Sequence, residues 1–325
     1  MLRLPPVDYA APSDLDEVVA LLADEGSVLM AGGTDLVPNL KRRQYPGAAR
    51  IVSLRRVPGV AGIDVADDGS VRIGALTTLA EVVADDRVPA VVREAAGLVA
   101  SPQLRNRGTV GGNLCVDTRC HWLNIPETWR QAAEPCLKAG GEVCWVAPAK
   151  KWCWAVSSSD LAPVMVAVEA TVRLVGPDGV REVPAAELYR DDGMDHLAKR
   201  PAEVITEVVI PPLTGLRAGY RKLRRRGSID FPILGVAAAL RFVDGRCTDA
   251  RIVLGAVASA PLRVTAAEEL AVSEPWSEGL VEQVAEAAGK AVRPMSNTDL
   301  TSRYRKRMVP VYVGRLLRDL GEDSG

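Results

Sequence analysis

Short apolar runs separated by glycine- and proline-containing turns fill the first half of the chain, and they predict a mixture of helices and strands. Leu15, Val18, Val19 and Leu22 have the spacing of one helical face, and Ser13 is the expected N-cap of this helix. The other elements predicted before residue 100 are strands at 28–30, 51–54 and 71–74, a helix that continues through residue 83, and a helix at 91–99.

The pattern changes after the proline pair at 211–212, which predicts a domain boundary near that point. The elements expected just before it are an apolar helix at 161–168 and strands at 170–175, 180–183 and 204–210. Those expected after it are a hairpin of strands at 233–242 and 250–256 and helices at 266–272, 280–292 and 309–320. The remainder is therefore a small α+β unit of roughly one hundred residues, a common domain size.

Length and charge exclude several classes of protein. A chain of 325 residues suggests two or three domains. Its 40 basic and 41 acidic residues nearly cancel, which argues against a general binder of nucleic acid or anionic membranes. The N-terminus lacks the apolar run of a signal peptide, and no apolar window is long enough to span a bilayer. We therefore expect a soluble, cytoplasmic protein.

Cysteine is concentrated in one part of the chain. Five of the six cysteines fall between Cys115 and Cys153, and local clustering in a chain that is neither small nor evidently secreted favours a metal site over a disulfide framework. We treat Cys115 and Cys247 as buried structural residues. The candidate ligands are Cys120, Cys136, Cys144 and Cys153.

These four thiols leave three possibilities open from spacing alone: zinc, an iron–sulfur cluster, or no metal. They contain no Cys-x-x-Cys pair, which most structural zinc sites use. His121 follows Cys120 directly, so it is expected to be a neighbour of the site rather than a ligand. Five of the six tryptophans lie in the same stretch, where bulky rings would limit the access of water to a cluster.

Two glycine-bearing loops are the candidate nucleotide site. Glycines in 31–35 and 108–113 would let backbone N–H groups approach a phosphate closely, although either loop taken alone is more often an ordinary tight turn. Neither loop matches the G-x-G-x-x-G pattern of nicotinamide-binding folds. Asp160 is either a ribose ligand or a helix N-cap, and the basic run at 220–226 is either a solvated face or a source of one flavin contact.

Five motifs in order resemble the FAD-binding subunit of the xanthine dehydrogenase family, which includes the medium subunit of aerobic carbon monoxide dehydrogenase. The motifs are Ala-Gly-Gly-Thr-Asp at 31–35, Ile-Gly-Ala-Leu-Thr-Thr at 73–78, Arg-Gly-Thr-Val-Gly-Gly-Asn at 107–113, Ser-Asp-Leu-Ala-Pro at 159–163 and Tyr-Arg-Lys-Leu at 220–223. The resemblance implies an α+β fold: a vanillyl-alcohol-oxidase-type (PCMH-type) FAD-binding domain at 1–214, with subdomains at about 1–57 and 58–214. A C-terminal α+β domain at 215–325 would follow, as in carbon monoxide dehydrogenase flavoproteins.

The same resemblance implies which residues bind the FAD, and it assigns the substrate site of the enzyme to another subunit, so no catalytic residue is expected here. The loop at 31–36 would wrap the pyrophosphate and the loop at 109–113 would complete the grip. The implied FAD-binding residues are Ala31, Gly32, Gly33, Thr34, Asp35, Leu36, Thr77, Thr109, Gly111, Gly112, Asn113, Asp160 and Lys222.

Residues 116–156, the cysteine segment, are an insertion relative to most members of this family. The segment resembles the insertion in the β subunit of 4-hydroxybenzoyl-CoA reductase, which carries a 4Fe–4S cluster, and the resemblance implies that Cys120, Cys136, Cys144 and Cys153 are its ligands. The implied partners are a molybdenum-cofactor subunit, a 2Fe–2S subunit and an electron carrier such as ferredoxin. The alternatives are a related hydroxylase subunit whose insertion binds zinc or only docks a partner, and a metal-stabilised interaction protein without flavin.

Overall fold

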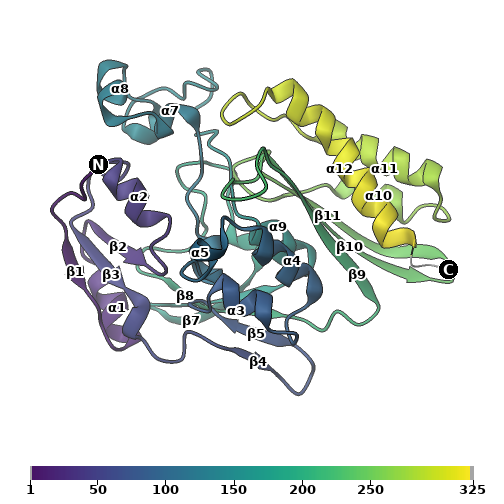
Figure 1. Cartoon of the computed structure of the whole chain (residues 1–325), viewed down its shortest axis with the longest axis horizontal. Helices are drawn as coiled ribbons and strands as arrows, with labels where there is room; N and C mark the ends of the chain where they lie inside the picture. The colour runs from purple at the N-terminus through teal and green to yellow at the C-terminus, as the bar shows by residue number, and fades with distance from the viewer. Residues whose placement is uncertain (1, 323–325) are drawn as a thin grey trace.

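A parallel three-stranded sheet forms the N-terminal part of the molecule, which is described here for residues 2–322 from a computed structural model (Figure 1). Its strand order is β1-β3-β2, and the two connections carry one helix each. The predicted strands at 28–30 and 51–54 are confirmed. The elements are β1 (Asp8–Ala10), α1 (Leu15–Leu22), β2 (Ser27–Met30), α2 (Leu36–Lys41) and β3 (Arg50–Ser53), followed by a 3₁₀ turn at Leu54–Arg56.

The N-cap of α1 is Asp14, so the expectation of Ser13 was wrong by one residue. Asp14 has an extended backbone, and its carboxylate accepts a hydrogen bond from the backbone N–H of Glu17 at 2.8 Å. A carboxylate at this position also interacts favourably with the positive end of the helix dipole. Two adjacent capping residues are not separable by sequence pattern, because either one would begin a helix with the same apolar face.

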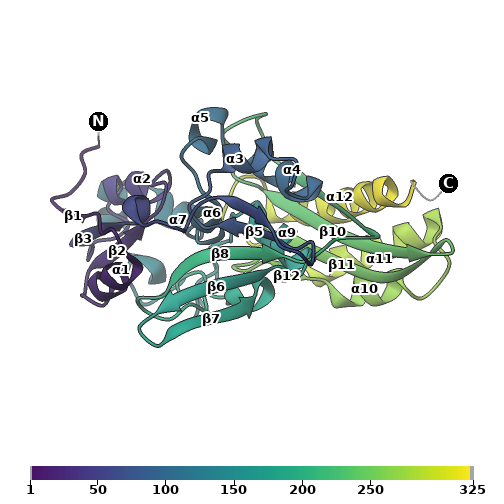
Figure 2. The ribbon, with the colours of Figure 1, turned by 90° about the horizontal axis from the view of Figure 1, so that it is seen from below.

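A five-stranded antiparallel sheet of order β4-β5-β8-β6-β7 forms the middle layer, and helices cover one of its faces (Figures 1 and 2). Helix α9 is buried along its whole length because neighbouring helices, a 3₁₀ turn and the next sheet pack around it. The strands are β4 (Ile63–Val65), β5 (Val71–Gly74), β6 (Thr171–Gly176), β7 (Gly179–Pro184) and β8 (Val204–Ile210). The helices are α3 (Leu79–Ala84), α4 (Ala90–Leu98), α5 (Pro102–Arg105), α6 (Val110–Leu114) and α9 (Leu161–Ala167), with a 3₁₀ turn at Ala185–Leu188.

A four-stranded antiparallel sheet of order β12-β11-β10-β9 follows. One face packs on α4 and α9, and the other carries the three C-terminal helices, so two apolar cores lie on opposite faces of the same sheet. The predicted hairpin is confirmed as β10 and β11. The elements are β9 (Leu216–Leu223), β10 (Leu234–Val243), β11 (Arg246–Gly255), β12 (Leu262–Arg263), α10 (Thr265–Ala271), α11 (Glu278–Ala291) and α12 (Ser302–Glu322).

Two elements of this last part differ from expectation. Helix α12 begins at Ser302, earlier than the predicted start at residue 309. The prediction missed its first turns because they are basic and carry no apolar stripe. The first residues of the basic run at 220–226 belong to strand β9, so the run is not simply a solvated face. Side chains two residues apart in a strand share a face, so Tyr220 and Lys222 both point at α9 while Arg221 is exposed.

The cysteine segment leaves the body and returns to the same place. Arg119 and Val156 exchange two backbone hydrogen bonds of 2.8 Å, which close its base. Between them lie α7 (His121–Asn124), α8 (Glu127–Ala132) and a 3₁₀ turn at Leu137–Ala139. In Figure 1 the segment lies beside α2 and the start of α12. No helix within residues 2–322 is both long and apolar enough to cross a bilayer.

Candidate functional site

The two glycine loops, far apart in the sequence, lie directly against each other. A Cβ added at Gly32 would lie 1.9 Å from the carbonyl oxygen of Arg107, so only glycine allows this approach. A Cβ at Gly112 would lie 3.7 Å from the Cβ of Ala31. The structure therefore brings together 31–35 and 107–113, which the sequence could only place separately.

The second glycine loop is anchored on the segment that follows β5. The N–H of Val110 donates to the carbonyl oxygen of Thr77 at 3.0 Å, and the N–H of Gly111 donates to that of Ala75 at 2.9 Å. The hydroxyl of Thr77 is fully buried and bonds both backbone groups of Gly62 at 2.9 Å. Thr77 thus supports the loop through its backbone, while its side chain is engaged elsewhere.

Asn113 joins this loop to the turn that precedes α9. Its side-chain oxygen accepts hydrogen bonds from the hydroxyl of Ser159 at 2.7 Å and from the N–H of Leu161 at 3.1 Å. Thr109 caps α6 by accepting from the N–H of Gly112 at 3.1 Å. The side chains of Thr109 and Asn113 therefore fix the shape of the loop.

Asp160 is held by two residues of β9. Its carboxylate accepts from the hydroxyl of Tyr220 and from the ammonium of Lys222, each at 2.8 Å, and Lys222 also donates to the carbonyl oxygen of Leu98 at 3.0 Å. Burial raises the pKa of Asp160, and the Lys222 ammonium opposes that shift. Asp160 occupies the N-cap position of α9, as one of the two expectations had it, but its side chain makes no capping hydrogen bond there.

The backbone and side chains around these loops suit a dinucleotide. Within residues 2–322, the N–H groups of Gly32, Gly33 and Thr34 make no hydrogen bond to a backbone acceptor, so they are available to phosphate oxygens. The buried hydroxyl of Ser158, in the turn that Asn113 holds, has no partner among the described residues. A cradle of this kind, lined by half-buried glycines, fits the pyrophosphate of FAD.

Arg119 connects the cysteine segment to the first glycine loop, and the sequence analysis missed it. Its guanidinium forms an ion pair with Asp35 and donates to the side-chain oxygen of Asn39 at 3.1 Å. It also lies 4.5 Å from the ring centroid of Phe231. Burial lowers the pKa of Arg119 to about 10. Nothing in the sequence marks Arg119, which precedes Cys120, as the partner of Asp35, because the two residues lie 84 positions apart.

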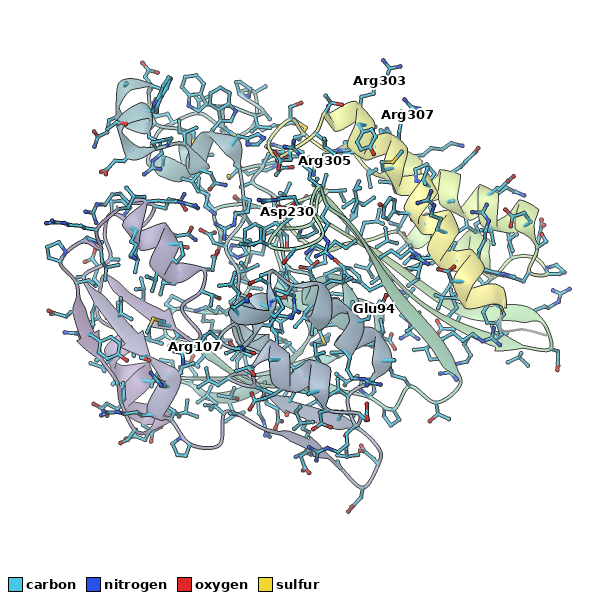
Figure 3. The ribbon with its side chains drawn as sticks, in the orientation of Figure 1. Glu94, Arg107, Asp230, Arg303, Arg305 and Arg307 are labelled. Carbon is cyan, nitrogen blue, oxygen red and sulfur yellow. The ribbon has the colours of Figure 1, made fainter. Side chains whose placement is uncertain are left out.

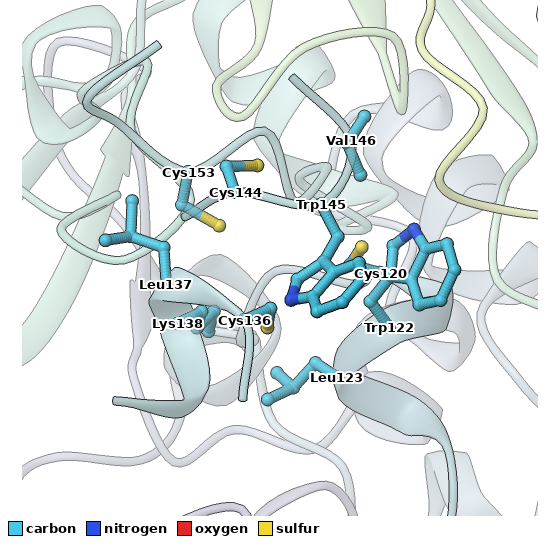
Figure 4. Close-up of a pocket in the computed structure, with 10 residues that line it drawn as sticks. All are labelled: Cys120, Trp122, Leu123, Cys136, Leu137, Lys138, Cys144, Trp145, Val146 and Cys153. Atoms are coloured by element: carbon cyan, nitrogen blue, oxygen red, sulfur yellow. The ribbon is translucent and has the colours of Figure 1, made fainter. Parts of the chain in front are cut away.

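The four predicted ligands surround one space, which we call the thiol pocket (Figure 4). Burial raises the pKa of the Cys120 thiol to about 12 and that of Cys153 to about 11. The indoles of Trp122 and Trp145 stack at 5.5 Å on its rim. The pocket is lined by Cys120, Trp122, Leu123, Cys136, Leu137, Lys138, Cys144, Trp145, Val146 and Cys153.

Beneath the thiol pocket lies a buried polar network, also missed from sequence. The ammonium of Lys138 donates to the carboxylate of Asp117 at 2.5 Å, to the hydroxyl of Thr118 at 2.6 Å and to the carbonyl oxygen of Gly193 at 2.7 Å. The hydroxyl of Tyr45 donates to the other carboxylate oxygen of Asp117 at 2.8 Å. These bonds tie the floor of the pocket to the body of the protein.

Asn297 of the C-terminal part holds both ends of the cysteine segment. Its carbonyl oxygen accepts from the N–H of His121 at 2.8 Å, and its side-chain nitrogen donates to the carbonyl oxygen of Trp154. The fully buried Arg305 donates to the side-chain oxygen of Asn297 at 3.2 Å. Figure 3 shows Arg305 pointing into the body, whereas Arg307, two residues on, points outward.

The remaining cysteines and histidines lie outside the thiol pocket. Cys247 is buried in the C-terminal core, and Cys115 packs against the central core. His121 begins α7 and is not among the residues that line the pocket. His196 is half-buried, and burial lowers its pKa.

Two subdomains that meet at paired glycine loops, followed by a sheet covered by three helices, define an FAD-binding domain of the PCMH type with the C-terminal domain of carbon monoxide dehydrogenase flavoproteins. The expected fold class is thus confirmed. Residues 5–213 match the family model described as the FAD binding domain in molybdopterin dehydrogenase, and residues 218–320 match the carbon monoxide dehydrogenase flavoprotein C-terminal domain. The chain belongs to this family, and it is an FAD-binding flavoprotein of the oxidoreductase class.

Named relatives agree with this assignment. The chain is 34% identical over 255 residues to the FAD-binding subunit of an aldehyde oxidoreductase from Escherichia coli, which covers 75% of this chain and 78% of the relative. It is 29% identical to the carbon monoxide dehydrogenase medium chain of Afipia carboxidovorans, over 95% of this chain and 94% of the relative. A structure of carbon monoxide dehydrogenase from Hydrogenophaga pseudoflava superposes with a TM-score of 0.80 at 28% identity, and the match covers 97% of each chain.

Proposed function

We propose that this chain is the FAD and 4Fe–4S electron-transfer subunit of a multi-subunit molybdenum oxidoreductase. The observation that carries the proposal is the convergence of four cysteines on one pocket, at the end of a segment whose base is paired to the FAD-binding loop through Arg119 and Asp35. Electron transfer between two redox groups requires that both be held close and rigidly. The ion pair between the two sites provides such a connection.

The thiol pocket offers four thiolate donors, a set that both zinc and a 4Fe–4S cluster use, and the resemblance of the cysteine segment favours the cluster. Four cysteines with apolar neighbours are the donor set of a 4Fe–4S cluster. Among residues 2–322, no three Cys, His, Asp or Glu side chains are gathered tightly enough for one ion.

We assign the FAD to the paired glycine loops and their neighbours. Ala31 to Leu36 and Thr109 to Asn113 would hold the pyrophosphate, with Thr77 supporting the second loop from behind. Asp160 and Lys222 would lie on the flavin side, each already held by the other. When bound, the flavin ring supplies both one-electron and two-electron chemistry, while the protein supplies position and electrostatics.

The proposed partners follow from the relatives, which include subunits named as medium chains. We propose a molybdenum-cofactor subunit and a 2Fe–2S subunit as companions in a dimerised heterotrimer, with a ferredoxin-like protein as the external carrier. The FAD-binding domain would extend to about residue 214, with its two subdomains dividing near residue 57 and the cluster segment at 116–156. Residues 215–325 would form the C-terminal domain.

The enzyme that we propose as the best match is one like 4-hydroxybenzoyl-CoA reductase, on the strength of the cysteine segment. The alternative is the flavin subunit of a related molybdenum hydroxylase, in which the segment binds zinc or only docks a partner. The exposed indole of Trp129, on the outer helix α8, is the feature that supports docking.

The deciding experiment is an anaerobic assay of iron, sulfide, zinc and flavin on the purified protein, with Cys136→Ser as the variant. The proposal predicts about four irons and one FAD per chain, and loss of the iron signal with retention of flavin in the variant. Zinc in place of iron would favour the alternative, and absence of any metal would leave only the docking role.

Cys247→Ser is the matched control. Its thiol is buried outside the pocket and donates to the carbonyl oxygen of Asp249 at 3.3 Å, a bond that a serine hydroxyl can also make. Iron content should therefore remain at the wild-type value. Equal iron loss in both variants would indicate general destabilisation rather than removal of a ligand.

A further inference from the structure

Lys138 stands out among the residues that line the thiol pocket. The nine others described there are cysteines, tryptophans, leucines and a valine, so Lys138 is the one charged residue among them. Its side chain is 11% exposed. A buried ammonium is costly unless it is paired and hydrogen-bonded, so its presence beside four thiols requires a reason.

The position of the charge is fixed. All three ammonium protons are used, on Asp117, Thr118 and the carbonyl oxygen of Gly193, at 2.5 to 2.7 Å. The side chain therefore does not turn toward solvent, as an exposed lysine would. Asp117 is not part of the pocket lining, and the hydroxyl of Tyr45 shares its negative charge. The positive member of the pair is thus the one that belongs to the pocket lining.

Gly193 connects Lys138 to the candidate ligand Cys153. Its carbonyl oxygen accepts from the ammonium at 2.7 Å, and its N–H donates to the carbonyl oxygen of Cys153 at 2.8 Å. Aliphatic and indole groups separate the pocket from water, so the charge is screened less than a surface charge would be. The backbone N–H of Ala155, which donates to the sulfur of Cys153 at 3.4 Å, also stabilises negative charge on that sulfur, and it is unchanged when Lys138 is replaced.

We propose that Lys138 is a positioning residue that raises the reduction potential of the cluster in the thiol pocket. This inference rests on the proposed function, because it requires the 4Fe–4S cluster. Reduction adds one electron, and therefore one negative charge, to the cluster and its four thiolates. A fixed positive charge on the pocket wall stabilises the reduced form, and protein charge and hydrogen bonding are known determinants of cluster potential.

The test is a potentiometric titration of the full chain as it purifies, with dithionite as reductant, mediators, and the electron paramagnetic resonance signal of the reduced cluster as readout. In Lys138→Gln, the amide can still donate to Thr118 or Gly193, but the charge is gone. We expect the equilibrium constant for one-electron reduction to fall about tenfold, which corresponds to about 59 mV for one electron. Lys138→Arg should keep the wild-type value within a third of that shift.

Lys150→Met is the matched control for loss of a positive charge. Lys150 belongs to the same segment but is exposed and lies over the outer ring of Trp152, with its nitrogen 5.2 Å from the ring centroid. Solvent screens it, so its loss should leave the potential unchanged. An equal shift in Lys150→Met and Lys138→Gln would overturn the assignment to Lys138.

Asp117→Asn provides a second, opposite test. It removes the carboxylate that offsets Lys138, while its side chain can still bond Tyr45 and Lys138, and the potential should rise. An unchanged potential in Lys138→Gln and Asp117→Asn, each with four irons, would overturn the inference and leave the proposed cluster intact. Loss of iron from both variants would also overturn it, because the pair would then be a structural support. A wild-type chain without iron would reject the proposed function itself.

Discussion

The ammonium of Lys222 lies 2.8 Å from the carboxylate of Asp160, and the two side chains are 1% and 3% exposed. Asp160 precedes α9 in the FAD-binding part, and Lys222 belongs to β9 in the C-terminal part. The pair therefore joins the two parts of the chain beside the candidate flavin site. Removing one partner of a buried pair leaves the other charge without compensation.

Lys222→Met should lower the free energy of unfolding by about 3 to 5 kcal/mol. Denaturant unfolding followed by circular dichroism measures this change. The matched control is Arg221→Met, the neighbouring residue, whose exposed ion pair with Asp319 should contribute less than about 1 kcal/mol. Similar losses of unfolding free energy in the two variants would mean that the buried pair of Lys222 and Asp160 contributes no more to stability than the exposed pair.

Gly32→Ala should abolish FAD binding. The added Cβ would lie 1.9 Å from the carbonyl oxygen of Arg107, so the two glycine loops must separate. Flavin absorbance per chain after gel filtration measures the effect. Gly47→Ala is the control, because a Cβ there meets no atom within 4 Å, and it should retain its flavin. Full flavin in Gly32→Ala would place the pyrophosphate elsewhere.

Asn297→Ala should reduce iron content at least twofold while leaving flavin bound. The side chain of Asn297 anchors Trp154, which directly follows the candidate ligand Cys153, so the substitution frees that end of the cysteine segment. Iron and flavin assays under the same conditions measure the two effects separately. Ser296→Ala changes an exposed neighbour and should alter neither. The idea fails if the Asn297 variant keeps full iron and resists proteolysis in the segment as well as the wild type.

His196 should make folding stability depend on pH. Burial lowers the pKa of its imidazole below the ordinary value of 6.5, so between those two values the unfolded chain binds more protons. The free energy of unfolding should therefore fall as the pH is lowered through about 6.5, and His196→Gln should show a smaller fall. Chemical unfolding at pH 8, 6.5 and 5 gives the comparison. Parallel curves for the two proteins would show that another group is responsible.

Features with local causes were predictable from the sequence. The helix at 161–168 was expected because its residues are apolar throughout, and α9 is indeed buried on every side. The hairpin of β10 and β11 was expected from two apolar runs around a short polar turn. The resemblance of several short motifs led to the fold of the whole chain, which no single motif could have established.

Features that depend on long-range pairing were not predictable. Arg119, Lys138 and Asn297 are ordinary polar residues in sequence, and only folding places each one next to its partners. The basic run at 220–226 was ambiguous for the same reason, because strand alternation sends Lys222 inward and Arg221 outward. Asp160 and Lys222 were each named as candidates, yet nothing in the sequence indicated that they contact each other.

The pairing of Arg119 with Val156 has a consequence for how such chains can diversify. Because the two backbones meet at the base, the path of the host domain before and after the segment is nearly continuous. The cost of closing a loop grows only slowly with its length, so the host tolerates either a short turn or a long excursion at this point. A junction of this kind lets an ancestral flavoprotein acquire an additional redox module, or discard it, without repacking its existing core.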